Sequence, residues 1–305
     1  MMGSRTASAL RRGFPRIARQ LSYQREFLSP TSIRVTIPGG LPYEAFEARG
    51  SKVTPWSLLH LFESTRAFSF WPMPAAERPE GSFADFNQLL MDNFFFIATA
   101  NLSIERQLYD EFTPKFPLSV TIHLDFVGRS SFLLTSSLAH MDTEPYAVCK
   151  VQSVLVNSTT RKPTPFPDWW RRKYLHNTCL SGTALKMKDL LEAKIDQCYQ
   201  HDVIVYPREC DSYFHTNWSN YVRYCSDTVS FGVLHKKFKN ITEKTLEHGI
   251  KELEISLLRE SNVGDKLNIV SWETNDGLNF RILKDSHACA QMSMSFFQDI
   301  FCSTT

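Results

Sequence analysis

The sequence lacks the features that mark a membrane-spanning, disulfide-bonded or zinc-binding protein. Its longest apolar runs, such as residues 94–98, are far shorter than the roughly 20 residues of a membrane-spanning helix. The seven cysteines are an odd number, and no two of them form a CxxC pair. Scattered cysteines favour buried, reduced thiols over a disulfide framework or a metal cluster. We therefore expect no membrane span, no metal and no cofactor.

Residues 1–25 contain no acidic side chain, although they contain six arginines and several serines and alanines. This composition is typical of a mitochondrial transit peptide, and residues 19–22 resemble a matrix-peptidase site with cleavage after Leu21. A disordered basic arm of a cytosolic protein is the alternative. Without the six arginines the formal net charge changes from +2 to −4, so we expect no nucleic-acid partner. The predicted location is the mitochondrial matrix.

An internal repeat relates the two halves of the chain, whose 305 residues are enough for two domains. Residues 53–59 and 215–221 align at an offset of 162 with Thr, Trp and Ser in common, and both stretches continue as helices of about four turns. Segments with strand-like alternation surround each helix: 33–37, 118–126, 132–138 and 146–156 in the first half, and 203–205, 253–257, 267–272, 278–283 and 288–297 in the second. The order strand, long helix, antiparallel strands therefore occurs twice, which predicts an α+β fold.

A proline-rich stretch at residues 161–167 separates the two halves. We expect a linker at residues 161–200, with a helix over 183–199. The predicted domains are then 30–160 and 201–300.

A cluster of polar residues, Asp211-Ser212-Tyr213-Phe214-His215-Thr216-Asn217, precedes the second helix. It resembles the D-x-x-x-H-V-N stretch of the 4-hydroxybenzoyl-CoA thioesterases and plant-type acyl-ACP thioesterases, in which a tyrosine follows on the helix, here Tyr221. The later segment Glu260-Ser261-Asn262-Val263-Gly264-Asp265 resembles their E-a-x-x-G-D segment. The resemblance covers about residues 30–300. It implies two tandem hot-dog domains, each a long central helix wrapped by an antiparallel β-sheet, with the active site in the second.

The match to these families is incomplete at three positions. Phe214 stands where many relatives have Gly, and Thr216 replaces Val. Tyr213 occupies the position of a catalytic Asn in the plant enzymes. These differences bear on how a substrate is oriented rather than on the fold.

Thioester hydrolysis needs an activated water or a nucleophile, together with donors for the oxyanion that develops. Asp211 or Glu260 is the candidate base, and the resemblance leaves Asp211 open as a nucleophile. We expect His215 and Asn217 to orient the reacting groups, and free N–H groups at residues 218–220 to face the oxyanion. The expected substrate-binding residues are Tyr213, Trp218, Asn220 and Tyr221. Structural alternatives are a helix cap for Asn217 or Thr216, a buried histidine for His215 and a surface carboxylate for Glu260.

The first half lacks the same residues, because the offset places Arg49 opposite Asp211 and Val53 opposite His215. We expect this half to be degenerate and to supply one wall of a substrate tunnel. The predicted function is hydrolysis of fatty acyl thioesters, with acyl-CoA or acyl carrier protein as the partner and a homodimer left open. The alternative is a non-catalytic hot-dog protein that binds acyl chains or acts as a mitochondrial assembly factor.

Overall fold

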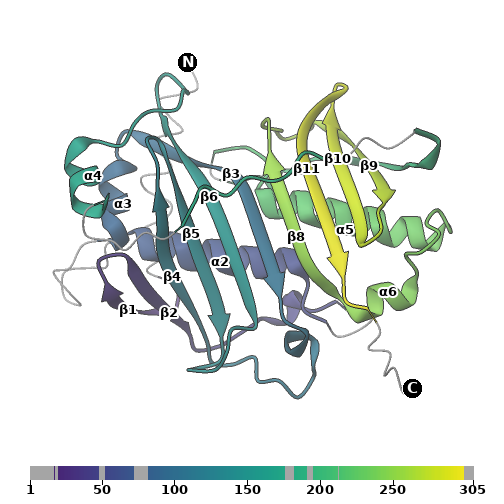
Figure 1. Ribbon diagram of the computed structural model, residues 1–305, viewed down its shortest axis with the longest axis horizontal. Coiled ribbons are helices and arrows are strands. Elements are labelled where there is room, and N and C mark those ends of the chain that lie inside the picture. Colours follow the sequence, from purple (N-terminus) through teal and green to yellow (C-terminus); the bar gives the residue numbers. More distant parts are fainter. Residues whose placement is uncertain are drawn as a thin grey trace.

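A single antiparallel sheet of eleven strands dominates the computed structural model, which describes residue 17 and residues 20–47, 52–71, 82–175, 182–190, 195–211 and 213–298. Its strand order is β1-β2-β4-β5-β6-β3-β8-β11-β10-β9-β7 (Figure 1). The strands of the first half are β1 Gln24–Ser29, β2 Ser32–Ile37, β3 Asn93–Ile104, β4 Leu118–Val127, β5 Ser131–Ala139 and β6 Ala147–Asn157. Those of the second half are β7 Tyr199–Ile204, β8 Ile250–Leu257, β9 Lys266–Glu273, β10 Gly277–Lys284 and β11 His287–Phe296.

The halves join where β3 pairs with β8, with Ala100 opposite Ile255 and Leu102 opposite Leu253. All four of these side chains are buried. The antiparallel sheet and the two long helices confirm the predicted α+β class, and every predicted strand is present. The sheet therefore continues without a break from one half into the other.

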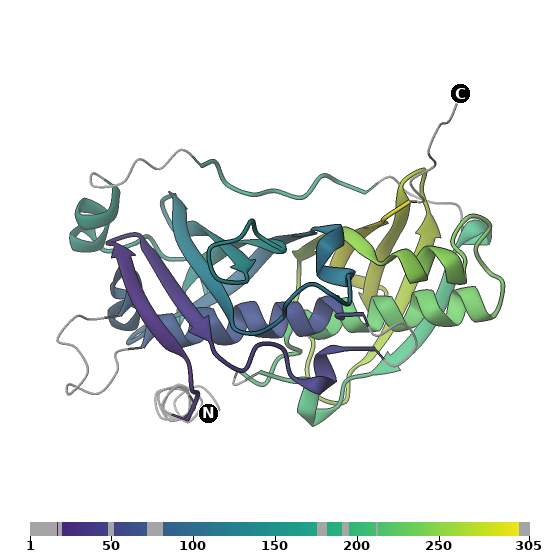
Figure 2. The same cartoon turned by 90° about the horizontal axis from the view of Figure 1, so that it is seen from below.

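Two long helices, α2 Pro55–Phe70 and α5 Trp218–Leu234, lie on the same face of the sheet (Figures 1 and 2). Each begins where the repeat predicts a helix, α2 with Pro at its first position and α5 after the N-cap residue Asn217. The Glu63 carboxylate of α2 accepts hydrogen bonds from Asn217 and Trp218 at the start of α5. The two helices therefore meet close to the loop that carries the predicted motif.

The shorter helices are α3 Phe86–Leu89, α4 Asp168–Leu175, α6 Glu243–His248 and the 3-10 helices η1 Tyr43–Ala45, η2 Phe83–Asp85, η3 Arg106–Tyr109, η4 Ile195–Gln197 and η5 Pro207–Glu209. The fully buried Trp170 fixes α4 in place, because its indole N–H donates to the Ala84 carbonyl at 2.7 Å and its ring stacks on Phe166. Trp170 thus anchors the linker to the first half.

The helix predicted over residues 183–199 is wrong. Residues 182–190 have no regular structure and cross the face of the sheet opposite α2 and α5 (Figure 2). The Leu185 N–H donates to the Gln152 side chain at 3.0 Å, which ties this segment to β6. An extended chain advances about 3.3 Å per residue against 1.5 Å in a helix, so these residues reach farther across the sheet than a helix of the same length would.

Most of the predicted transit segment 1–25 lies outside the described residues. Its last residues belong to the folded body, because β1 begins at Gln24. The Tyr23 ring packs edge-on against Phe68 at 5.6 Å, and its hydroxyl lies 3.2 Å from that of Ser64. Cleavage after Leu21 would keep these contacts.

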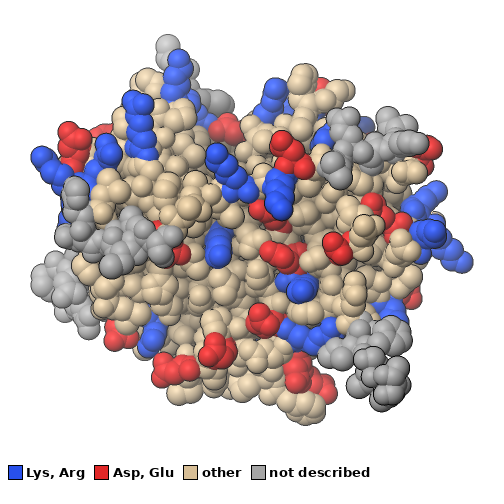
Figure 3. All heavy atoms as spheres, viewed as in Figure 1, with Lys and Arg blue, Asp and Glu red and all other residues tan. Residues whose placement is uncertain are grey.

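The outer face of the sheet carries acidic and basic side chains side by side, and neither sign covers it (Figure 3). Among the described helices, none is both long and apolar enough to cross a membrane. Most of the buried apolar residues pack into one large core, and Val35 and Phe68 form a second, small cluster.

Candidate functional site

The loop that carries the predicted motif runs from η5 to the start of α5. The buried Glu209 fixes this loop, since its carboxylate accepts from the Tyr206 backbone N–H at 2.7 Å and from the Tyr224 hydroxyl at 2.6 Å. Arg223 of α5 donates to the other oxygen. These hydrogen bonds outweigh the effect of burial and lower the pKa of Glu209. The anchor holds Cys210, Asp211 and residues 213–216 close to the N-terminus of α5.

A tight turn brings Asp211 and His215 together. The Asp211 Oδ1 accepts from the backbone N–H of Tyr213 at 2.8 Å and of His215 at 3.3 Å. Phe214 has φ +65°, the left-handed conformation in which glycine is favoured. Phe214 therefore adopts the backbone conformation that suits the glycine found in many relatives, and this conformation costs a non-glycine residue about 1–2 kcal/mol.

The Asp211 carboxyl is poised to exchange a proton near neutral pH. Its burial raises its pKa from 3.8 to about 7. The negative charges of Glu63 and Glu260 act in the same direction, whereas the two backbone N–H groups oppose the shift. A base with a pKa near the working pH is the most effective kind for proton transfer.

His215, Glu260 and Arg161 form a chain of polar contacts beside Asp211. The His215 Nε2 lies 3.1 Å from Glu260 Oε2, and Arg161 donates to Glu260 Oε1 at 2.6 Å. Arg161 also lies 3.5 Å from His215 Nε2. Burial lowers the pKa of His215, an effect that Glu260 opposes and Arg161 strengthens. His215 is therefore favoured as a neutral ring that can exchange hydrogen bonds with a reacting group.

These groups line a cavity of about 280 Å³ between the two halves. Of the predicted residues, Asp211, Tyr213, His215, Trp218, Tyr221 and Glu260 lie in its wall. The Tyr221 hydroxyl is fixed by that of Ser261 at 2.7 Å. Phe95, Phe96 and Ile97 of β3 supply apolar surface, and the Phe96 ring lies beside those of Tyr213 and His215. The cavity thus combines titratable groups with an apolar wall.

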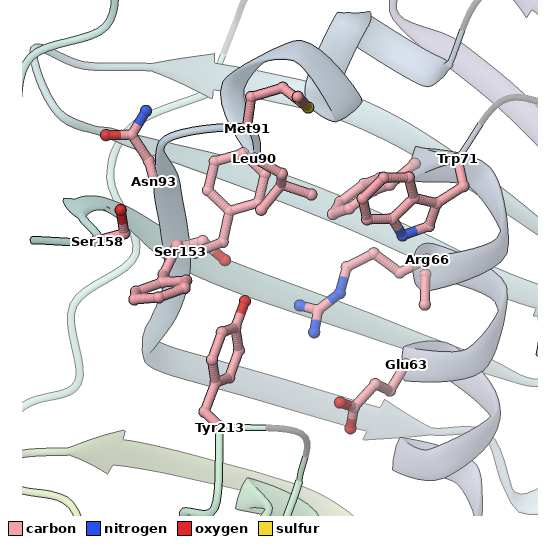
Figure 4. Close-up of a pocket in the computed structure, with 13 residues that line it drawn as sticks. Glu63, Arg66, Trp71, Leu90, Met91, Asn93, Ser153, Ser158 and Tyr213 are labelled. Carbon is pink, nitrogen blue, oxygen red and sulfur yellow. The ribbon is translucent and has the colours of Figure 1, made fainter. Parts of the chain in front are cut away.

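A second cavity of about 100 Å³ lies next to the first and belongs mostly to the first half (Figure 4). The two share the wall residues Glu63, Arg66, Phe95 and Tyr213. Trp71, Leu90 and Phe94 make most of its remaining wall apolar. A bound molecule that passes from one cavity to the other would therefore move from the Asp211 side into the first half.

Two predicted residues lie behind the cavity wall instead. Asn217 is the N-cap of α5, with its Oδ1 accepting from the Ser219 N–H at 3.0 Å, and its amide donates to Glu63 at 2.9 Å. The Asn220 amide donates to the Glu209 carbonyl at 2.9 Å. The N–H groups of Ser219 and Asn220 are both bound within the helix start, so they are not the free oxyanion donors that we expected. In the described part of the chain, the N–H of Trp218 remains for that role.

The first half and the start of the linker contribute residues that sequence analysis missed: Glu63 and Arg66 of α2, the aromatic run of β3, and Arg161 after β6. The one available signal was the presence of Glu63 and Arg66, one turn apart, on a helix with many apolar residues. Val53, the predicted counterpart of His215, is buried and pairs with Phe46, and Arg49 lies outside the described residues. Where the structure describes side chains, no three metal-ligating residues form a group.

Several solved structures share this architecture. A 12:0-ACP thioesterase from Umbellularia californica superposes with a TM-score of 0.65 at 14% sequence identity, over 90% of this chain and 100% of that one. An acyl-ACP thioesterase from Bacteroides thetaiotaomicron gives a TM-score of 0.62 at 14% identity, over 87% of this chain and 98% of that one. The chain has the hot-dog fold of these thioesterases.

A putative oleoyl thioesterase from Lactobacillus plantarum also has this hot-dog fold, with a TM-score of 0.62 at 14% identity over 90% of this chain and 96% of that one. No family model and no curated protein matches the sequence. The likeness of this hot-dog protein to the solved thioesterases therefore lies in the fold.

Proposed function

We propose that this protein hydrolyses acyl thioesters. The observation that carries the proposal is the meeting of Asp211, whose pKa is about 7, with His215 and Glu260 in the wall of one cavity. The apolar wall from β3 offers a surface for an acyl group beside these residues. The thioesterase neighbours share the fold on which this site is built.

In the hydrolytic reaction, a water molecule held by Asp211 and His215 attacks the thioester carbonyl carbon. Asp211 accepts a proton from this water as the new C–O bond forms, and the oxygen that becomes negative is stabilised by the Trp218 N–H. The C–S bond then breaks, and the thiolate receives the proton that Asp211 took up. Direct attack by the Asp211 carboxylate is the second route, in which the C–S bond breaks, the thiolate leaves, and water then hydrolyses the resulting mixed anhydride to the free acid and the Asp211 carboxylate.

The finer assignments belong to the same proposal. The halves correspond to two tandem hot-dog units, because each has a 3-10 helix, a bridged loop and a long helix in the same order, with Phe46 paired to Val53 in the first and Cys210 to Thr216 in the second. The substrate is a fatty acyl group on CoA or on acyl carrier protein. The basic segment before β1 directs the chain to the mitochondrial matrix, and a homodimer remains open.

The test is a panel of acyl-CoA and acyl-ACP substrates of increasing length, assayed for thiol release by the chain that begins at Ser22. We expect turnover that depends on Asp211 and Glu260, so kcat should fall strongly in Asp211→Asn and in Glu260→Gln. The double variant should lose far less in kcat than the product of the two single fold-losses, because the two carboxylates act together. Binding of acyl-CoA without turnover on either carrier would overturn the proposal. The non-catalytic role in acyl binding, to which the apolar packing of Tyr213 on Phe94 is suited, would then take its place.

A further inference from the structure

The cavity of the first half contains an arginine, Arg66, whose side chain has no hydrogen-bond or ion-pair partner among the described residues. Arg66 lines both cavities, and Figure 4 shows its guanidinium pointing from α2 into the space beside Tyr213. No hydrogen bond or ion pair of its side chain is found among the described residues. A guanidinium carries five N–H donors in a planar fork that matches a carboxylate.

The nearby carboxylate of Glu63 is engaged elsewhere. Its Oε2 accepts from the Asn217 amide at 2.9 Å and from the Trp218 indole at 3.1 Å, both on the α5 side. Arg66 and Glu63 do not form an ion pair within 4.0 Å. The positive charge of Arg66 is therefore left for whatever enters the cavity.

Two further donors point to the same space. The hydroxyls of Tyr213 and Ser153 line this cavity, and neither has a hydrogen-bond partner in the described part of the chain. Burial raises the pKa of Tyr213 far above its ordinary value, so its hydroxyl keeps its proton and can donate it. Three hydrogen-bond donors thus line one cavity. A plain alkyl chain bound there would shield these donors from water without accepting a hydrogen bond from any of them, and burying unpaired donors costs free energy.

We propose that the acyl group of the substrate carries a carboxylate, which is bound by Arg66, Tyr213 and Ser153. This inference rests on the proposed hydrolase function and narrows its substrate class. Arg66 lines both cavities, so a carboxylate bound there lies at the far end of an acyl group whose thioester is at Asp211, and the substrate class narrows to dicarboxylic acyl groups. The phosphates of the carrier are excluded as the bound anion, because the whole pantetheine arm separates them from a thioester at Asp211.

The experiment compares pairs of CoA thioesters of equal carbon number, glutaryl against pentanoyl and adipoyl against hexanoyl. The wild type should prefer the acid of each pair in kcat/KM by roughly 10- to 100-fold, which is the contribution of a charge-assisted hydrogen bond. Arg66→Met should abolish this preference, mainly through KM. Arg66→Lys should keep part of it, because it retains the charge without the fork. The control is Arg129→Met, which removes an exposed arginine of the same half and should keep the wild-type ratio.

The outcomes separate this inference from the hydrolase proposal. If the wild type hydrolyses both members of each pair equally well, or if Arg66→Met keeps the ratio, the carboxylate site is refuted while thioester hydrolysis stands. If nothing is hydrolysed, calorimetry measures the binding of two stable thioethers, S-(5-carboxypentyl)-CoA and S-hexyl-CoA, and the ratio of their affinities tests the carboxylate site. Binding of the acid at least tenfold tighter, lost in Arg66→Met, supports the site without turnover, and equal binding overturns it.

Discussion

Replacing Asp211 by Asn should make the protein more stable and less active at the same time. Burial raises the pKa of Asp211 from 3.8 to about 7, so the ionised carboxylate is less favourable in the folded than in the unfolded chain. Asn has nearly the same shape but carries no charge. Its Oδ1 can still accept from the N–H groups of Tyr213 and His215.

The sign of the pH dependence follows from the direction of the shift. Between about pH 4 and pH 7 the folded protein holds a proton that the unfolded chain has released, so stability falls as the pH rises through this range and levels off above it. A shift of about three pKa units lowers the free energy of unfolding by about 4 kcal/mol at pH 8, compared with a pH below 4. About 2 kcal/mol of this loss has already occurred at pH 5. The advantage of Asp211→Asn over the wild type should therefore grow by about 2–3 kcal/mol between pH 5 and pH 8.

Urea unfolding of the wild type and Asp211→Asn at the two pH values measures this difference. Asp276→Asn, in an exposed turn between β9 and β10, is the matched control and should show no such change. In the same samples kcat/KM of the wild type should rise with pH up to about 7. Asp211→Asn should lose roughly 100-fold or more in kcat, which is the usual effect of removing a general base.

The two readouts refute different parts of the reasoning. An equal stability difference at pH 5 and pH 8 would mean that the pKa of Asp211 is not raised, and the physical basis for its role as base would be lost. Full turnover in Asp211→Asn would show that the active groups lie elsewhere in the chain.

Three further predictions concern the groups around the site and the N-terminus. Arg161→Met removes a cation 3.5 Å from His215, so the pKa of His215 should rise in an NMR titration and kcat should fall about tenfold; an unchanged imidazole pKa would contradict this. Glu63→Gln weakens the acceptor shared by Asn217 and Trp218 and should lower the free energy of unfolding by about 1–2 kcal/mol, whereas Glu44→Gln, at an exposed position, should leave it unchanged. A chain that begins at Ser22 should have a higher Tm than one that begins at Glu26, because only the first keeps the contact of Tyr23 with Phe68; equal melting temperatures would argue against a structural role for these residues.

The elements that sequence analysis predicted are those with a clear period. The segment that became β4 alternates apolar and polar residues, and the start of α5 combines a capping residue with helical spacing. β1 was missed because its side chains are mostly exposed and its first residues lie within the arginine-rich segment. β3 was missed because its residues 94–98 are all apolar. A continuous apolar run occurs both in strands in the middle of a wide sheet and in buried helices, so it does not distinguish the two.

The site was predictable where its residues are neighbours in the sequence. Asp211 and His215 lie in one motif, and Glu260 follows in a second motif that the resemblance supplied. Arg161 reaches Glu260 across 99 positions, and Glu63 reaches Asn217 across 154. No local pattern encodes such contacts, because they depend on how α2 packs against α5 and on where the chain turns after β6.

Because α2 packs against α5, the cavity beside Asp211 is lined by residues from two separate parts of one chain. In an assembly of two identical chains, each substitution appears in both cavities at once, so the reactive side and the opposite wall are copies of the same residues. Here Asp211 and His215 are encoded in one stretch of the chain, and Arg66 in another that carries no reactive group. A substitution at Arg66 therefore changes the wall that the two cavities share and leaves Asp211 and His215 unchanged. Under the proposed function, substitutions in α2 can therefore change which acyl group is bound while the residues proposed to react stay the same.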